Sequence, residues 1–254
     1  MLLSSICAIV TGHTRGIGAA LTKQLLERGI AVLGLSRHCY PDLPKRFRRR
    51  FIEIRIDLSN LLDVETWITS DRLRSFIDSA SCVLLFNNAG TIEPIGPLGS
   101  QDTRFIRYSV CLNVATPLML SSALANSLPD GSECRIAHLS SGAARHPYSG
   151  WSIYCATKAS LDHHARVVAM EENNAFRICS IAPGIVDTDM QATIRASSIN
   201  QFPSLERFKK LKKSGKLSMP ENVAQKLIDY IFSDEFGKTP VVDIRELPDF
   251  YSLY

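Results

Sequence analysis

Tyr154 and Lys158 stand four residues apart in the run GWSIYCATKAS, which is predicted to form one long helix. Residues at this spacing share a helix face, so the phenol and the ammonium group can point into the same small volume. A phenol normally keeps its proton until about pH 10, and a nearby positive charge favours the phenolate. We expect Lys158 to pull the pKa of Tyr154 toward neutrality and to suit it for proton transfer. The competing interpretation is a packed tyrosine followed by a solvated lysine.

The run TGHTRGIG places Gly12, Gly16 and Gly18 directly after a predicted first strand. Glycines at such a turn let the backbone approach a ligand, and the N-terminus of the helix that follows offers free N–H groups to a pyrophosphate. The spacing G-x-x-x-G-x-G differs from the common dinucleotide fingerprint, and a glycine-rich run can be a simple turn. Its place after the first strand of an alternating α/β chain favours dinucleotide binding.

The end of the second predicted strand indicates which dinucleotide is bound. An acidic residue there would bind the ribose hydroxyls of NAD. The chain has Ser36 and Arg37 instead, and Arg15 precedes the second glycine of the turn. Two guanidinium groups without a carboxylate suit a 2′-phosphate, so we predict NADP(H).

Short apolar, β-branched runs alternate with longer helical patterns, which predicts a Rossmann-type, doubly wound parallel sheet of about seven strands with helices on both faces. The whole chain, 1–254, is predicted to be one domain, with a helix-and-loop excursion over the substrate around 191–216. The predicted strands are 5–11, 30–36, 51–57, 82–87, 133–140, 176–182 and 240–244. The predicted helices are 16–28, 61–79, 105–127, 152–172 and 221–233.

Composition narrows the classes of partner. The formal net charge is +4, and the basic run at 45–51 lacks the aromatic platform of a nucleic-acid surface, so no nucleic acid is expected. The seven cysteines show no paired or zinc-like spacing, which predicts free thiols, no metal site and a reducing, cytoplasmic setting. No apolar run is judged long enough to span a bilayer, so no membrane partner is expected.

Five motifs in order resemble those of the short-chain dehydrogenase/reductase family along most of the chain. TGHTRGIG resembles the cofactor turn, NNAG at 87–90 the motif after the fourth strand, and APGIVDT at 182–188 the nicotinamide-side loop. YCATK resembles the catalytic tyrosine and lysine, and LSSG the catalytic serine. Ser141, thirteen residues before Tyr154, is favoured over Ser140 for that role, and Asn113 lies where the family has its fourth catalytic residue.

The resemblance implies that Tyr154 protonates a carbonyl oxygen as NADPH delivers hydride, while Lys158 lowers the tyrosine pKa and holds the nicotinamide ribose. Ser141 would hydrogen-bond the substrate oxygen, and Asn113 would hold a water that links Lys158 to solvent. Asp57 would contact adenine. The expected catalytic residues are Asn113, Ser141, Tyr154 and Lys158. The expected NADP(H) contacts are Gly12, Thr14, Arg15, Gly16, Ile17, Gly18, Ser36, Arg37, Asp57, Asn88, Ala89, Gly90, Tyr154, Lys158, Pro183, Gly184, Ile185 and Thr188.

Further stretches, SSGAARHPYSGWSIY and VVDIREL among them, are similar to sepiapterin reductases and benzil-type diketone reductases. Asp243 matches the aspartate with which sepiapterin reductases hold the pterin, although a strand-end turn or surface pair is equally compatible. Trp151 and Met190 are expected to line the substrate pocket with Ser141 and Tyr154, with core packing the competing role for Trp151. The implied reaction is NADPH-dependent reduction of a ketone in a vicinal dicarbonyl compound or a pterin side chain.

Three alternatives stay open. The chain could bind NADPH as a non-catalytic sensor or scaffold, although all four catalytic positions are present. It could be a 3-oxoacyl reductase, although the Gly-Gly tail of the bacterial carrier-protein reductases is missing, or an alcohol dehydrogenase working oxidatively. In this family the helices corresponding to 105–127 and 152–172 commonly form a subunit interface, so a homodimer, with a tetramer as the alternative, is expected.

Overall fold

The computed structural model describes residues 5–250 except 41, 172 and 174. Its centre is a parallel sheet of seven strands in the order β3-β2-β1-β4-β5-β6-β7. The strands are β1 (Ile6–Thr11), β2 (Ala31–Ser36), β3 (Phe51–Arg55), β4 (Cys82–Asn87), β5 (Glu133–Leu139), β6 (Phe176–Ala182) and β7 (Val241–Asp243). Strands β1, β2 and β4 are buried at every residue after the first, as a sheet covered on both faces requires. The predicted doubly wound fold is confirmed.

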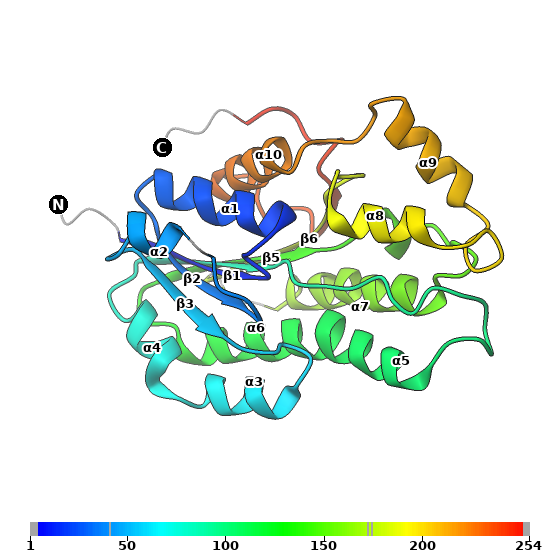
Figure 1. Ribbon diagram of the computed structural model, residues 1–254. Helices are drawn as coiled ribbons and strands as arrows, with labels where there is room; N and C mark the ends of the chain where they lie inside the picture. The colour runs from blue at the N-terminus through cyan, green and yellow to red at the C-terminus, as the bar shows by residue number, and fades with distance from the viewer. Residues whose placement is uncertain (1–4, 41, 172, 174, 251–254) are drawn as a thin grey trace.

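Helices cover both faces of this sheet (Figure 1). Helices α1 (Gly16–Glu27) and α10 (Pro220–Phe232) pack side by side on one face. The opposite face carries α3 (Leu61–Ile68), α4 (Asp71–Ile77), α5 (Thr103–Val110), α6 (Thr116–Ser127) and α7 (Ser152–Val168). Each face has its own apolar core, centred on Leu25 and Ile228 on the first and on Leu85 and Ile136 on the second.

Two predicted helices differ from the observed ones. The single helix predicted at 61–79 is two helices, because α3 ends at Ile68 and Ser70 is the extended N-cap of α4. The helix predicted at 105–127 begins at Thr103 and contains a π-helical segment, η1 (Cys111–Ala115). Inserted π turns are frequent at functional sites, and Asn113 is in this one. Helix α7 ends at Val168, and the last position of the predicted helix, 172, lies outside the described residues.

The continuous helical stretch Thr103–Ser127 has 25 residues and is apolar and long enough to cross a membrane by length and composition alone. The expectation that no apolar run reaches this length is therefore wrong. In the fold this stretch covers one face of the sheet, and Leu120 and Leu124 belong to the core there. Its apolar character is that of a helix packed against a buried sheet.

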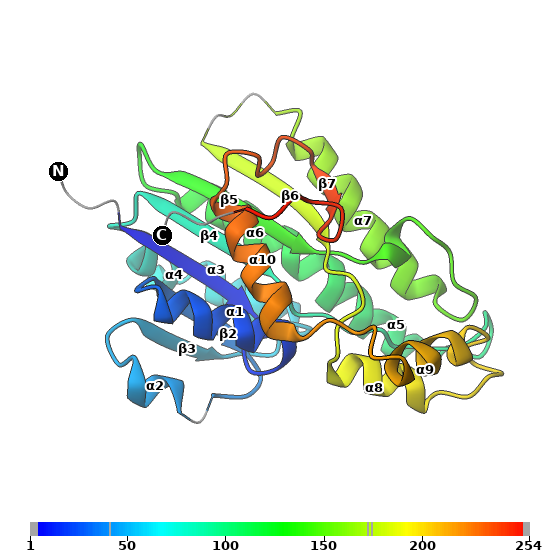
Figure 2. The same cartoon turned by 90° about the horizontal axis from the view of Figure 1, so that it is seen from above.

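The strand order reverses between β1 and β4: β2 and β3 extend the sheet on one side of β1, and β4 to β7 extend it on the other. The connections after β1 and β4 therefore run to opposite sides and leave a crevice at the carboxyl ends of these strands. The predicted excursion at 191–216 contains most of α8 (Asp189–Ala196) and all of α9 (Leu205–Lys213). Figure 2 shows α8 and α9 together beyond the end toward which the strands point. Two short helical elements remain: α2 (Leu43–Arg46), near β3, and the 3-10 turn η2 (Gly142–Ala144), after β5.

Candidate active site

A cavity of about 890 Å³ opens at the carboxyl ends of the strands, and the loops after β1 to β6 contribute to its wall. Most of the residues expected to bind cofactor or substrate line it. These are Gly12, Thr14, Arg15, Gly16, Ile17, Ser36, Arg37, Asp57, Asn88, Ala89, Gly90, Ser141, Trp151, Tyr154, Lys158, Pro183, Gly184, Ile185, Thr188 and Met190. Three expected residues lie behind the wall: Gly18, Asn113 and Asp243.

Each of the three turn glycines has a physical reason to be glycine. Gly12 and Gly16 have φ of 68° and 53°, the left-handed region that side chains disfavour. A Cβ on Gly18 would lie 2.2 Å from the Gly12 carbonyl oxygen, so this glycine lets α1 pack against the turn. The expectation that Gly18 contacts the cofactor is corrected on this ground: its role is packing beneath the contact surface.

The turn and the strand ends fit a phosphorylated dinucleotide. In the described structure no side chain caps the N-terminus of α1, whose first turn contains no acidic residue, so its backbone N–H groups are available to an anion. Arg37 lines the cavity and has no hydrogen-bond or ion-pair partner among the described residues. Arg15 makes one long contact, 3.4 Å from Nη1 to Asp189 Oδ2, and both side chains are largely exposed. Both guanidinium groups can therefore meet a phosphate.

His13, which the sequence reasoning passed over, holds this turn in place. Its ring is fully buried, its Nε2 lies 2.8 Å from Glu53 Oε1, and it fills the space that a side chain on Gly34 would need. The contact fastens the turn to β2 and β3. The sequence shows a polar ring, His13, between two glycines of the turn, but its partner Glu53 is forty residues away, so local spacing does not identify the contact.

Tyr154 lies on α7 with its ring 6 % exposed and lines the cavity. Burial raises the pKa of Tyr154 to about 12, and a hydrogen bond with the Ser141 hydroxyl opposes this shift. The expectation that Lys158 brings the tyrosine pKa toward neutrality is therefore wrong for this structure. The Lys158 ammonium lies 5.9 Å from the ring centroid, and burial of the phenol is the largest cause of the shift in its pKa.

The Lys158 ammonium is held at the cavity wall by a hydrogen bond to a backbone carbonyl group. Its Nζ donates to the carbonyl oxygen of Leu139 at 2.7 Å. Burial lowers the pKa of Lys158 to about 8, and the negative charge of Asp162 opposes this shift. The ammonium therefore remains mostly protonated at pH 7, close to the point at which it can release a proton.

The two serines after β5 have separate roles. The Ser141 hydroxyl accepts from the backbone N–H of Ala143 at 3.1 Å, lines the cavity and hydrogen-bonds with Tyr154. The Ser140 hydroxyl instead donates to Asp162 Oδ1 at 2.7 Å. Ser141 is thus the serine placed beside the phenol, as the spacing of thirteen residues predicts.

Asn113 is fully buried in the π-helical segment and does not reach the cavity surface. Its Nδ2 donates to the Thr91 carbonyl oxygen at 2.8 Å and to Thr157 Oγ1 at 3.1 Å, and its Oδ1 accepts from the Thr91 N–H. A Cβ on Gly90 would lie 3.2 Å from Asn113 Oδ1 and 3.5 Å from Lys158 Nζ. Asn113 therefore stands beside the lysine with only a glycine between them; its part in a proton relay stays a prediction.

Asp162, a buried carboxylate beneath the catalytic residues, was not identified from the sequence as part of the site. Asp162, 2 % exposed, lies one helical turn beyond Lys158. Its Oδ1 accepts from the hydroxyls of Ser140 and Ser180, each at 2.7 Å, and its Oδ2 accepts from Arg145 Nε at 3.1 Å. This one carboxylate joins α7 to the ends of β5 and β6. The spacing Tyr154, Lys158, Asp162 on one helix face was the available signal.

The carboxylate of Asp243, expected to hold substrate, does not line the cavity. Both of its carboxylate oxygens are held by Arg245, with Nε 2.8 Å from Oδ1 and Nη2 2.6 Å from Oδ2, and its side chain is 6 % exposed. Arg245, not Asp243, lines the cavity. The strand-end ion pair, the competing interpretation, is what the structure shows, because an arginine two residues along can reach both oxygens.

Trp151 combines the two roles considered for it. It lines the cavity, yet it is 3 % exposed and belongs to an aromatic cluster from distant parts of the chain. Its ring stacks on Phe202 at 4.4 Å and lies 5.4 Å from the rings of both Phe208 and Tyr154. Met190, at the start of α8, also lines the cavity and packs against this cluster. The excursion thus contributes Phe208 to the cavity wall and Phe202 to the packing behind it.

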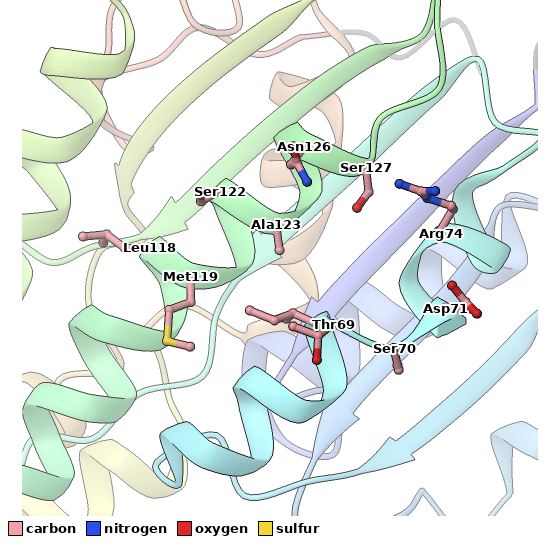
Figure 3. A pocket seen from close by; sticks show the side chains of 11 residues that line it. Thr69, Ser70, Asp71, Arg74, Leu118, Met119, Ser122, Ala123, Asn126 and Ser127 are labelled. Carbon is pink, nitrogen blue, oxygen red and sulfur yellow. The ribbon is translucent and has the colours of Figure 1, made fainter.

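A second hollow, of about 850 Å³, lies between α6 and the α3–α4 pair (Figure 3). Met119 of α6 and Thr69 face the hollow from opposite sides. None of the residues expected to bind cofactor or substrate lines it. The candidate chemistry is therefore confined to the cavity at the strand ends.

Comparison with known proteins agrees with this geometry. A sequence model of the family described as short chain dehydrogenase matches residues 6–198. Benzil reductase ((S)-benzoin forming) of Bacillus cereus is 34 % identical over 245 residues, covering 94 % of this chain and 98 % of the relative. Sepiapterin reductase of Mus musculus is 32 % identical, with 95 % and 97 % covered. A crystal structure of a short-chain dehydrogenase/reductase from Burkholderia vietnamiensis is 48 % identical, with 96 % and 99 % covered and a TM-score of 0.70. The resemblance drawn from the sequence motifs is confirmed.

Proposed function

The chain belongs to the short-chain dehydrogenase/reductase family, and from that premise we propose that it is an NADPH-dependent reductase of ketones with Tyr154 as general acid. Membership makes it an oxidoreductase that uses a nicotinamide cofactor. The observation that carries the proposal is the meeting of Tyr154, Ser141 and Lys158 in one cavity whose other end is the glycine turn. That arrangement supports catalysis over the sensor or scaffold alternative, because the full proton-transfer set is in place.

The proposed cofactor site follows from the donors on the wall. The turn Gly12–Ile17 and the start of α1, which line the cavity, would hold the pyrophosphate, and Arg15 and Arg37 would hold the 2′-phosphate. Asp57 would contact adenine, and the loop Pro183–Thr188 would hold the carboxamide. When bound, the reduced cofactor supplies the hydride, and the protein positions and polarises the carbonyl.

The protein's own groups handle the proton. Tyr154, whose raised pKa keeps its hydroxyl protonated at neutral pH, donates that proton to the carbonyl oxygen. Ser141 stands beside the phenol, and when a substrate is bound its hydroxyl can donate to the same carbonyl oxygen while its lone pair accepts from a backbone N–H. Lys158 supplies a positive charge that stabilises the phenolate left by the transfer.

Two points support a vicinal dicarbonyl substrate of the benzil type. The aromatic cluster around Trp151 offers apolar ring faces beside the proton donor. Asp243, which would grip a pterin, already has both oxygens bound by Arg245, so pterin side chains are the less favoured substrates. Relatives of both kinds match over most of the chain.

The test of turnover is NADPH consumption by the purified protein with benzil and, separately, with sepiapterin. We expect benzil to be reduced, and Tyr154→Phe to lower kcat by about a hundredfold or more, a far larger change than its effect on NADPH affinity. A Tyr154→Phe variant of normal activity, or no NADPH consumption with either compound, would contradict the proposal.

The test of cofactor choice is Arg37→Asp. Its new carboxylate would repel the 2′-phosphate and accept the ribose hydroxyls of NADH, so NADPH use should fall far more than NADH use. Equal losses with the two cofactors would overturn the assignment to NADP(H).

We also propose a homodimer in a reducing, cytoplasmic setting. The helices expected at the interface carry exposed apolar side chains, Phe105 and Val110 on α5 and Val167 on α7, and Met170 just beyond α7 is 82 % exposed. Each of the seven cysteines is a free thiol. Sedimentation of the protein at micromolar concentration tests the dimer, and a monomer would contradict it.

A further inference from the structure

Two arginines line the cavity wall beyond the catalytic residues and are not used by the mechanism. Arg207, on α9, has its Nη1 3.4 Å from the Tyr148 hydroxyl and its guanidinium carbon 5.8 Å from the centre of that ring. Within the described part of the chain no carboxylate pairs with Arg207. Most of its N–H donors are therefore free for a ligand.

Aromatic rings connect this arginine to the proton donor. The Trp151 ring centroid lies 5.4 Å from that of Tyr154, and the Tyr148 centroid lies 5.3 Å from that of Trp151. The wall thus begins at the catalytic phenol and ends beneath the Arg207 guanidinium. A substrate with its carbonyl at Tyr154 can lay an apolar body along these rings.

Arg245 adds a second cation at this end of the cavity. Its ion pair with Asp243 uses Nε and Nη2, and its Cδ would lie 3.0 Å from a Cβ on Gly184 in the nicotinamide-side loop. Its second terminal nitrogen is left for a further acceptor. Because the Asp243 carboxylate is buried and bound, the group presented to the cavity here is the guanidinium.

The charged groups of the cavity wall are mostly cationic. Three carboxylates line it, of which Glu93 is on the loop after β4, against five cations: Arg15, Arg37, Lys158, Arg207 and Arg245. The other two lining carboxylates, Asp57 and Asp189, follow β3 and begin α8 beside the cofactor turn.

We propose that Arg207 and Arg245, with Tyr148, form an anion subsite, and that the preferred substrates are carbonyl compounds bearing a carboxylate beyond an aromatic spacer. A guanidinium binds a carboxylate through two parallel hydrogen bonds, and the aromatic rings beneath it limit competition from water. The inference rests on the proposed reductase function and names its substrate class.

The test compares benzil, 4-carboxybenzil and the methyl ester of 4-carboxybenzil as substrates of the full chain with NADPH. The acid and the ester share the reacting carbonyls and the rings and differ in the charge. We expect kcat/KM to be about tenfold higher for the acid than for the ester, mainly through KM, and the preference to shrink in high salt.

Substitutions of the two arginines test whether they produce the preference for the acid. Arg207→Gln and Arg245→Gln should each reduce the acid-over-ester preference at least threefold; the preference is a ratio measured on one variant, so a change in overall turnover does not affect it. Arg104→Gln is the matched control, because that arginine is 83 % exposed on α5 and lies off the cavity. Arg207 is exposed, so its variant keeps the test valid even if loss of Arg245 unfolds the protein.

The outcomes separate the two proposals. Equal kcat/KM for acid and ester, or a preference that survives Arg207→Gln, overturns the anion subsite and leaves the reductase intact. If none of the three compounds is turned over, the reductase proposal fails, and calorimetry with the NADPH complex decides the subsite. Tighter binding of the acid than of the ester then supports it, and equal or no binding refutes it.

Discussion

Replacing Lys158 by methionine is expected to abolish turnover and yet make the folded protein more stable at pH 7. The Lys158 side chain is almost completely buried, and burial lowers its pKa from 10.5 to about 8. Keeping this ammonium charged in the folded state at pH 7 therefore costs about 3 kcal/mol. Methionine has similar length without the charge, and the lost hydrogen bond to Leu139 costs about 1–2 kcal/mol. The expected net gain is about 1–2 kcal/mol.

The pH dependence of this gain follows from proton binding. Between pH 8 and pH 10.5 the unfolded lysine keeps its proton while the folded one has released it, so the wild-type protein gains stability as the pH rises. The methionine variant lacks this contribution. The wild-type protein should therefore gain about 2 kcal/mol relative to the variant from pH 7 to about pH 9.5, so that the stability advantage of the methionine variant disappears or reverses.

Urea denaturation of both proteins at the two pH values measures this difference directly. Lys238→Met is the control, because that lysine is 60 % exposed and pairs with Glu235 on the surface. Its substitution should change the unfolding free energy by less than about 0.5 kcal/mol at either pH. A Lys158→Met protein that is less stable than wild type at pH 7, or a difference that does not vary with pH, would refute the reasoning.

Two further substitutions test the framework of the site by urea denaturation. Asp162→Asn should lower the unfolding free energy by about 2–4 kcal/mol, because the new amide turns N–H donors toward an arginine donor. The control, Asp189→Asn, changes a side chain that is 74 % exposed and should alter the unfolding free energy by less than about 0.5 kcal/mol. Similar effects at the two positions would argue against a buried network. Gly18→Ala should lower the unfolding free energy by about 1–3 kcal/mol and weaken cofactor binding, because its Cβ would lie 2.2 Å from a carbonyl oxygen. In the control, Gly142→Ala, the new Cβ would have no neighbour within 4 Å, so stability should not change. A Gly18→Ala variant as stable as wild type would show that the turn can relax.

Local patterns in the sequence were enough for the fold and for most of the cavity wall. Each of the seven predicted strands was found within two residues of its predicted bounds, because buried parallel strands read as unbroken apolar runs between helices. Residues that follow strands in such a sheet all meet at one edge. Placing Gly12, Ser36 and Ser141 in one cavity therefore needed only the assignment of the strands.

What the sequence did not reveal depends on contacts between distant segments. The pKa of Tyr154 is set by burial, and part of that burial comes from Trp151, which is itself covered by Phe202 some fifty residues along the chain. The direction of the Asp243 side chain is equally hidden, because a carboxylate at a strand end can face a ligand or the next loop. Here Arg245 captures it. The spacing of residues in the sequence thus identifies the candidate site residues, and the packing of distant segments determines what each side chain contacts.

The raised pKa of Tyr154 also predicts an asymmetry between the two directions of catalysis. In reduction the phenol must still hold its proton when the carbonyl oxygen gains negative charge, and burial ensures this at neutral pH. In oxidation of the alcohol the resting enzyme must present the phenolate, which is scarce until the pH approaches the pKa. The rate of oxidation should therefore keep rising to a higher pH than the rate of reduction, which falls once the phenol or Lys158 loses its proton. Pre-steady-state rates of both reactions across this range measure the effect. Coincident pH profiles would mean that cofactor binding lowers the phenol pKa far enough to remove the penalty that burial imposes here.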